Sequence, residues 1–229
     1  DTVEYLYAAF AESAPGDPTF ESVMVEQLDL EDLSGNSNNG SNKGATFQTS
    51  VKKFYDGAAD FSGNKKVTVS GNDFAFGTGD YTIEMWVYHT ASGAQATYFG
   101  DTYGDTAGVY FYKNSANYIG VYYTSQIATG VTLIPVNTWV HVAAVRNAGT
   151  TTVYVNGSPD GSGADTTNLT VTNYGVGETP GGNSGSMEGY IQDVRVYKGI
   201  AKYTSSFSPP ERSVQGTARR YPSGVYVVS

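Results

Sequence analysis

The chain has 229 residues, which is enough to form a sizeable core without disulfide bonds, and it contains no cysteine. Charged residues make up 15% of it, and 22 acidic against 13 basic residues give a net charge of −9. This balance argues against a nucleic-acid partner, because binding phosphates requires clustered Lys and Arg. The lack of cysteine excludes a zinc–thiolate site and a cysteine nucleophile, and no apolar run approaches the roughly 20 residues that membrane insertion requires.

Three parts of the chain differ in composition. Residues 1–20 combine an apolar stretch, VEYLYAAF, with the break APGDP, and we expect a linker or the end of a preceding module. Residues 21–210 are predicted to form one domain. Residues 211–229 are expected to be a C-terminal extension.

Short strands are predicted at regular intervals along the central part. They are FQTSVKK, AADFSGNKKVTVS, DYTIEMWVYHT, ATYFGD, GVYFYKN, NYIGVYYTS, TWVHVAAVRN, TTVYVNG, TNLTVTNYGVG and GYIQDVRVY. Turn signals such as GTGD, NAGT and NGSPDGSG separate them. Apolar spacing becomes helical only around Ile200, Tyr203 and Phe207, before a double proline. Many strands without intervening helices indicate an all-β antiparallel sandwich or barrel.

Alternation along three of these strands assigns their side chains to two faces. The expected inner set is apolar and includes Ile83, Met85, Val87, Val109, Phe111, Ile119 and Val121. The expected outer set is Thr82, Glu84, Trp86, Tyr88, Tyr110, Tyr112, Tyr118 and Tyr122. One sheet is therefore expected to have an outer face rich in Tyr and Trp.

Three ordered stretches carry a resemblance to a known family. GNDFAFGTGDYTIEMWVYHT, NTWVHVAAVRNAGTTTVYVNG and MEGYIQDVRVYKGIAKYTSSFSPP resemble the laminin-G-like, concanavalin A-like jelly-roll domains, over about residues 21 to 210. The third stretch is similar to versions found in bacteriophage and marine virus tail or virion proteins. The resemblance implies a sandwich of two curved antiparallel sheets. It also implies a non-catalytic module, displayed on virions or outside cells for adhesion or glycan recognition.

Catalysis on this fold would require a pair of carboxylates. Retaining glycosidases hold two of them about 5 Å apart, but DYTIEMWVY offers only Glu84 on its face and no EXDXXE pattern occurs elsewhere. His89 and His141 lie far apart in sequence and no GXSXG motif accompanies them, so His141 is interpreted as a satisfied sheet histidine. The sequence therefore predicts no enzyme.

Calcium is the expected cofactor, if any, because this fold often binds it at the sheet rim through Asp, Asn and carbonyl oxygens. The first candidate is the loop with Asp101 and Asp105. Two further loops contain Asp32 with Asn36 and Asp160 with Asp165. Each is also a normal turn, since Asp and Asn bond their own backbone there, and both interpretations stay open.

The aromatic outer face is the main functional signal. Sugars present apolar C–H faces edged with hydroxyls, which suit aromatic rings next to polar groups. The predicted ligand-contacting residues are Trp86, Tyr98, Tyr103, Tyr110, Tyr112, Tyr118, Tyr122 and Glu84. The alternative is that this face packs against other virion subunits, including further copies of this chain.

The last predicted strand contains an irregularity. Val194 and Val196 share one face, whereas Ile191 is out of step with them, and this predicts a β-bulge. Asp193 and Arg195 would then lie side by side. The segment with Ile200, Tyr203 and Phe207 is expected to cap the open end of the sandwich.

Overall fold

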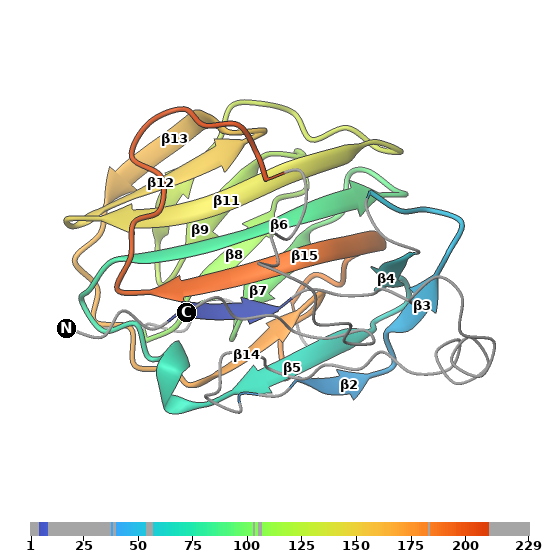
Figure 1. Ribbon diagram of the computed structural model, residues 1–229, viewed down its shortest axis with the longest axis horizontal. Coiled ribbons are helices and arrows are strands. Elements are labelled where there is room, and N and C mark those ends of the chain that lie inside the picture. The colour runs from blue at the N-terminus through green and yellow to red at the C-terminus, as the bar shows by residue number, and fades with distance from the viewer. Residues whose placement is uncertain are drawn as a thin grey trace, which may run out of the picture.

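The computed structural model describes residue 38, residues 40–53, 57–102, 104, 107–182 and 184–210, and the backbone of residues 5–8. These residues form two antiparallel sheets that pack face to face (Figure 1). Sheet A contains, in spatial order, β13 (Ser158–Ala164), β12 (Thr150–Val155), β11 (Trp139–Asn147), β6 (Tyr81–His89), β15 (Gly189–Lys198), β4 (Ala58–Asp60) and β3 (Thr46–Gln48), and β1 (Tyr5–Ala8) also pairs with β15. Sheet B contains β10 (Gln126–Thr129), β9 (Ile119–Tyr122), β8 (Tyr110–Lys113), β7 (Ala96–Gly100), β14 (Asn173–Val176), β5 (Lys66–Ser70) and β2 (Ser41–Lys43).

The all-β sandwich expected from the sequence is confirmed. The described part of the chain has only one short helix, the 3₁₀ turn η1 (Asn72–Phe74), and no helix there is long and apolar enough to cross a membrane. The chain passes between the sheets several times. For example, β6 belongs to sheet A, β7 to β10 belong to sheet B, and β11 to β13 belong to sheet A again.

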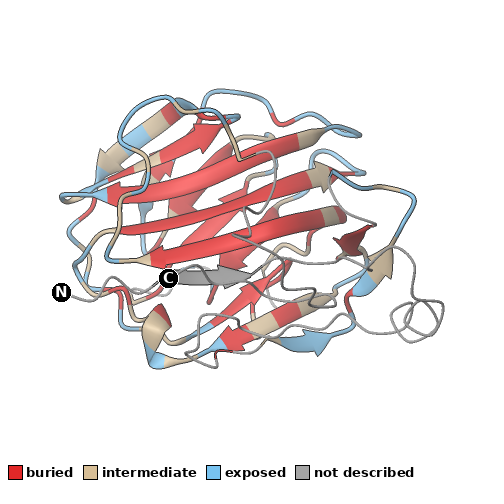
Figure 2. Ribbon diagram, in the orientation of Figure 1, coloured by how far each residue is buried: buried red, intermediate tan, exposed pale blue. Residues whose placement is uncertain are grey.

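The core lies between the two sheets, and the central strands are buried along most of their length (Figure 2). The predicted inner sets are confirmed, because all of these side chains belong to one buried cluster: Ile83, Met85, Val87, Val109, Phe111, Ile119 and Val121. Alternation identified them because a half-buried strand has a side-chain period of two.

Three strands, β2, β10 and β13, lie where no strand was predicted. β10 carries little apolar signal, and β13 was interpreted as the turn NGSPDGSG. The glycines of β13 have a different role, because a Cβ on Gly161 would lie 2.0 Å from the Thr129 carbonyl oxygen, and one on Gly163 would lie 1.8 Å from that of Ile127. Glycine therefore lets β13 approach β10, which brings the edges of the two sheets together.

The β-bulge in β15 is confirmed. Gln192 pairs with Trp86 and Arg195 pairs with Glu84, so two residues of β15 stand opposite the single residue between Trp86 and Glu84. The extra residue is accommodated by Asp193, whose φ is 59°. Asp tolerates this left-handed conformation better than most residues, and the bulge restores the inward direction of Val194.

The apolar spacing after β15 indicated a helical turn, and this was wrong, because residues 200–210 form no helix. We call this segment the C-terminal strap. It crosses the outer face of sheet A instead of capping an open end (Figure 1). Tyr203 and Phe207 pack there on Ala143, Val145 and Tyr154, and their spacing of four residues reflects a loop in which the two rings stack on each other.

The predictions for the two ends fall mostly outside the described residues. Within residues 1–20, Tyr5–Ala8 adds a strand to sheet A beside β15, in register from Tyr5 opposite Tyr197 to Ala8 opposite Val194. Part of the predicted linker is therefore attached to the sandwich.

Candidate functional site

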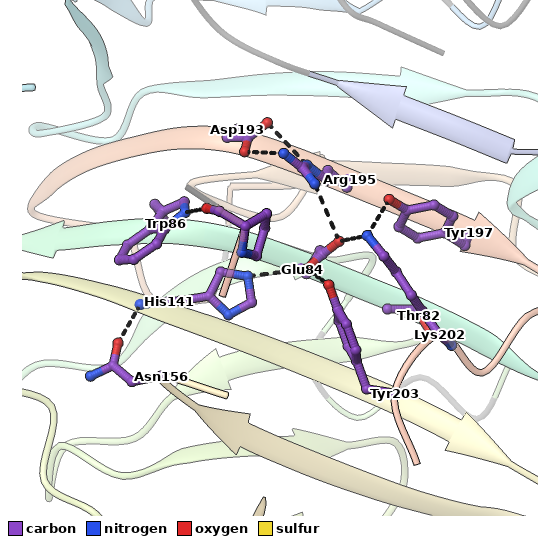
Figure 3. Close-up of polar contacts among 11 residues, drawn as sticks. Thr82, Glu84, Trp86, His141, Asn156, Asp193, Arg195, Tyr197, Lys202 and Tyr203 are labelled. Atoms are coloured by element: carbon purple, nitrogen blue, oxygen red, sulfur yellow. Dashed lines mark hydrogen bonds and ion pairs between the residues drawn. The ribbon is translucent and has the colours of Figure 1, made fainter. Parts of the chain in front are cut away.

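Glu84 lies at the centre of β6, on the outer face of sheet A beneath the strap (Figure 3). Its Oε1 accepts a bond of 2.7 Å from Lys202 Nζ and lies 3.9 Å from Arg195 Nη1. Its Oε2 accepts a bond of 2.8 Å from the Tyr203 hydroxyl and lies 3.1 Å from His141 Nε2. The carboxylate is fully buried, so among the described residues these side chains compensate its charge.

The environment keeps Glu84 ionised. Burial by itself raises the pKa of this carboxyl, but the hydrogen bond from His141 and the charges of His141, Lys202 and Arg195 outweigh burial and lower the pKa to about 2. A general acid in glycoside hydrolysis needs a raised pKa instead. Glu84 is therefore suited to attaching the strap to sheet A through Lys202 and Tyr203.

Neighbouring residues complete the network. Arg195 donates two hydrogen bonds to Asp193, of 3.1 and 2.6 Å, so the predicted side-by-side placement of these residues is confirmed. Lys202 Nζ also donates to the Tyr197 hydroxyl at 2.7 Å. Burial, followed by the Glu84 charge, raises the pKa of the Tyr197 and Tyr203 hydroxyls, which therefore remain protonated donors or acceptors.

His141 is only partly satisfied, in contrast to the expectation. Its backbone N–H donates to Asn156 Oδ1 at 3.0 Å and its Nε2 faces Glu84, but Nδ1 is buried without a hydrogen-bond partner among the described residues. The ring packs edge-on against Trp86 and Phe207, with centroid distances of 5.3 and 5.7 Å. The rings of Trp86 and Phe207 thus pack against the His141 imidazole.

Trp86 lies two residues beyond Glu84 on the same face and is 7% exposed. Its Nε1 donates to the Pro210 carbonyl at 3.2 Å, and Lys53 Nζ lies 4.2 Å from the ring centroid. Trp86 and Glu84 are therefore covered by the described chain and do not offer an open aromatic surface.

The predicted tyrosines of sheet B share one outer face. Tyr110 and Tyr122 stand opposite each other on β8 and β9, and the Tyr112 ring lies 5.0 Å from that of Tyr110. Both rings are buried against the sheet, since a Cβ on Gly100 would lie 2.6 Å from Tyr110 and one on Gly120 would lie 3.3 Å from Tyr112. These two rings form the floor of the face.

Accessible groups surround this floor. Tyr118 and Tyr122 are half-exposed, and the Tyr112 hydroxyl donates to Gln126 Oε1 at 2.7 Å. Gln95 Nε2 donates to the Tyr110 hydroxyl at 2.8 Å. The face thus combines half-exposed rings with amide side chains.

Tyr98 lies elsewhere, because its side chain points into the core. Its hydroxyl is 2.9 Å from His89 Nε2, and burial raises its pKa well above the usual value. Burial and the nearby Lys113 charge lower the pKa of His89 to about 3, so the imidazole is neutral in this pair. Tyr98 is part of an internal polar cluster and not of a ligand surface.

The expectation of one aromatic face is therefore corrected. Trp86 and Glu84 belong to sheet A, whereas Tyr110, Tyr112, Tyr118 and Tyr122 lie on sheet B or beside it, and the core separates the two groups. Alternation assigns a side chain to a face of its own strand, but it does not say which sheet the strand joins. Tyr103 lies outside the described residues.

The calcium candidates have different environments. Asp160 accepts hydrogen bonds from the amides of Val131 and Thr132, and Asp165 accepts them from the Tyr123 and Thr151 hydroxyls, so the structure gives both carboxylates anchoring contacts. Asp101 is 4% exposed, and Asp105, Asp32 and Asn36 lie outside the described residues. No group of three or more potential metal ligands occurs in the described ranges, and calcium at the Asp101 loop stays a prediction.

Sheet A also contains a row of three aromatic residues that the sequence did not predict. Tyr88 stands between Trp139 of β11 and Tyr190 of β15 in direct cross-strand register. All three side chains are half-exposed. We call Trp139, Tyr88 and Tyr190 the aromatic row; only the pairing register of three separate strands reveals it.

Comparisons with known proteins agree with this architecture. The model of the concanavalin A-like lectin/glucanases superfamily matches residues 61–201. Domain 4 of AbnA, an extracellular arabinanase of family GH43 from Geobacillus stearothermophilus, solved with arabinotriose, has a TM-score of 0.61 and 19% identity over 86% of this chain and 94% of its own. Trypanosoma rangeli sialidase in complex with sialic acid has a TM-score of 0.60 and 14% identity over 86% of this chain. The match spans only 31% of that sialidase, and no curated protein sequence matches this chain.

Proposed function

Because this chain belongs to the concanavalin A-like lectin/glucanase superfamily, we propose that it is a non-catalytic module that binds carbohydrate. It is displayed on the surface of a phage or virus particle, as a tail fibre, spike or capsid decoration, or otherwise outside the cell. Its ligands are host-surface glycans. Each site binds weakly, and several copies of the module raise the overall strength by increasing the effective concentration.

The outer face of sheet B is the observation that carries this proposal. Rigid tyrosine rings form its floor, and Tyr118, Tyr122 and Gln126 border it. Rings contact the apolar faces of sugars, and amides exchange hydrogen bonds with their hydroxyls. The neighbour solved with arabinotriose makes arabino-oligosaccharides suitable first ligands.

The state of Glu84 supports a non-catalytic role. Its pKa of about 2 and its four side-chain neighbours suit an anchor and not a proton donor. Asp193, on the neighbouring strand, has both carboxylate oxygens bonded to Arg195. A two-carboxylate hydrolase requires one carboxyl that is free to attack or to protonate.

A glycan array, followed by titration calorimetry on the best ligand, tests the proposal. Wild-type protein is expected to bind a defined oligosaccharide, and Tyr122→Ala and Gln126→Ala are expected to weaken binding about tenfold, the effect of losing roughly 1.4 kcal/mol of contact. The matched control is Thr68→Ala, on β5 at a distance from these tyrosines along sheet B. An array without any bound glycan would refute the proposal, and release of shortened sugars during incubation would refute its non-catalytic part.

A second function, as a structural virion subunit, has a specific observation in its favour. Val131 and Leu133 are 78% and 59% exposed on the loop between β10 and β11, where Asp160 accepts hydrogen bonds from two of its amides and the Thr132 hydroxyl. Exposed aliphatic side chains on a held loop suit contact with another protein subunit. Light scattering decides between the two: a stable oligomer that Leu133→Ser dissociates favours subunit packing.

A further inference from the structure

The aromatic row differs from the other described tyrosine clusters in the state of its polar groups. Most tyrosine hydroxyls of the other clusters form hydrogen bonds inside the molecule, as in the bonds from Tyr112 to Gln126 and from Tyr203 to Glu84, although none is described for Tyr118. In the described part of the chain, no hydrogen bond uses the hydroxyls of Tyr88 or Tyr190 or the indole N–H of Trp139. The row thus presents three polar groups that are available to a ligand.

The geometry of the row is fixed by the sheet. Ring centroids lie 5.5 Å apart between Trp139 and Tyr88, and 5.7 Å apart between Tyr88 and Tyr190. These steps follow from the cross-strand pairs, so the row runs across the strands and not along them. Figure 2 shows the corresponding ends of β11, β6 and β15 at intermediate burial beside fully buried strand centres.

The rings are tilted by 57° and 63° relative to their neighbours. They therefore form a ridged surface, which does not suit a flat fused-ring ligand. A flexible chain of sugar units can place one unit against each ring and orient its hydroxyls towards the adjacent polar group.

The carboxylate nearest to Tyr190 in the strand register is compensated. Asp60 stands opposite Tyr190, but its carboxylate forms a 2.9 Å ion pair with Lys65 and accepts the Ser62 amide. The row itself contains no charged residue. These facts favour a neutral ligand over a sialylated or uronic acid chain, which would need unpaired cations to replace its hydration.

We infer that the aromatic row is a separate binding site for a neutral linear oligosaccharide that lies across β11, β6 and β15. The inference rests on the proposed function, carbohydrate binding, but places a site on the sheet opposite the sheet B tyrosines. A protein partner fits this surface less well than it fits the loop with Val131 and Leu133, because the row combines rings with free polar ends and the loop is aliphatic.

Calorimetry on the full chain with two panels tests the inference: neutral arabinan, mannan and glucan oligosaccharides, and sialylated or uronic acid oligosaccharides. Trp139→Ala and Tyr190→Ala are expected to weaken binding of a neutral oligosaccharide about tenfold or more, as expected for aromatic anchors. Tyr88→Phe keeps the ring and removes only the hydroxyl, so it is expected to weaken binding about threefold without disturbing the fold. Thr68→Ala, on β5 of sheet B and outside both aromatic surfaces, is the control and is expected to leave this affinity unchanged.

The other outcomes separate the inference from the proposed function. Loss of binding in Tyr122→Ala with full affinity in all three row variants overturns the inference and leaves the proposed function intact. The same holds if only acidic oligosaccharides bind. If neither panel binds, both fail. A change of oligomeric state in Trp139→Ala without any change in glycan affinity would assign the row to protein contact and overturn the inference.

Discussion

The outer face of β6 contains two regions with opposite properties. Thr82, Glu84 and Trp86 are covered by the strap, which contacts them in order through Ile200, Lys202 and Pro210. Tyr88, the next outward residue, lies with Trp139 and Tyr190 in a half-exposed row. The strand and the face are shared, so the difference in exposure comes from the segments that cover Thr82, Glu84 and Trp86.

This difference shows how one sheet face can serve both stability and binding. Under the strap, Glu84 is bonded inside the molecule, and loss of Glu84 or of a charged partner leaves a buried charge uncompensated. In the row, ring edges and donors face water, and a change there costs the fold little. Substitutions in the covered region should therefore lower stability, whereas substitutions in the uncovered row should lower ligand affinity.

The largest expected effect is on the covered region. Glu84→Gln removes the charge that compensates Lys202 and Arg195, and we expect it to lower the free energy of unfolding by about 3–5 kcal/mol, as breaking a buried ion pair does. Urea denaturation followed by tryptophan fluorescence measures this. The control is Asp60→Asn, which breaks the more exposed pair with Lys65 and should cost less than about 1 kcal/mol. Equal losses in both variants would contradict the comparison.

The second largest expected effect is a loss of stability at acidic pH, which also arises in the covered region. The pKa of Glu84 is about 2 in the folded protein and ordinarily 4.5, so the unfolded chain takes up the proton first as the pH falls. The stability that Glu84 contributes is therefore complete above pH 4.5 and is lost as the pH falls towards 2, by about 1.4 kcal/mol per pH unit. Urea midpoints between pH 5 and pH 3 measure the slope. Glu84→Gln should show a smaller slope, and an identical slope would show that Glu84 does not titrate as described.

The smallest effect is expected in the uncovered row. Tyr88→Phe removes a hydroxyl that bonds to no described residue, so the free energy of unfolding should change by less than about 0.5 kcal/mol. The same substitution beneath the strap, Tyr203→Phe, removes a bond to the buried Glu84 carboxylate and should cost about 1.5–3 kcal/mol. Thermal and urea unfolding of the two variants compares them directly. A larger loss in Tyr88→Phe would mean that the row is part of the stability network.

The prediction of β15 shows how much local pattern can reveal. Its apolar residues fall out of step, and this alone predicted the bulge that the structure has at Asp193. The inner faces of β6, β8 and β9 followed in the same way from alternation. The strap did not, because the spacing of Ile200, Tyr203 and Phe207 satisfies a helix period equally well, and only its contacts with sheet A decided the conformation.

The sequence by itself determined the all-β class, the inward side chains, the bulge and the resemblance to the superfamily, since each depends on neighbours within one strand or on ordered motifs. Tertiary structure decided which sheet each aromatic residue joined and which outer positions were covered. Tyr88 and Trp86 have the same local pattern, but one is half-exposed and the other hydrogen-bonded to Pro210. Contacts with distant segments set that outcome, such as the bond between Trp86 and Pro210 at a separation of 124 residues, and alternation along a single strand contains no information about them.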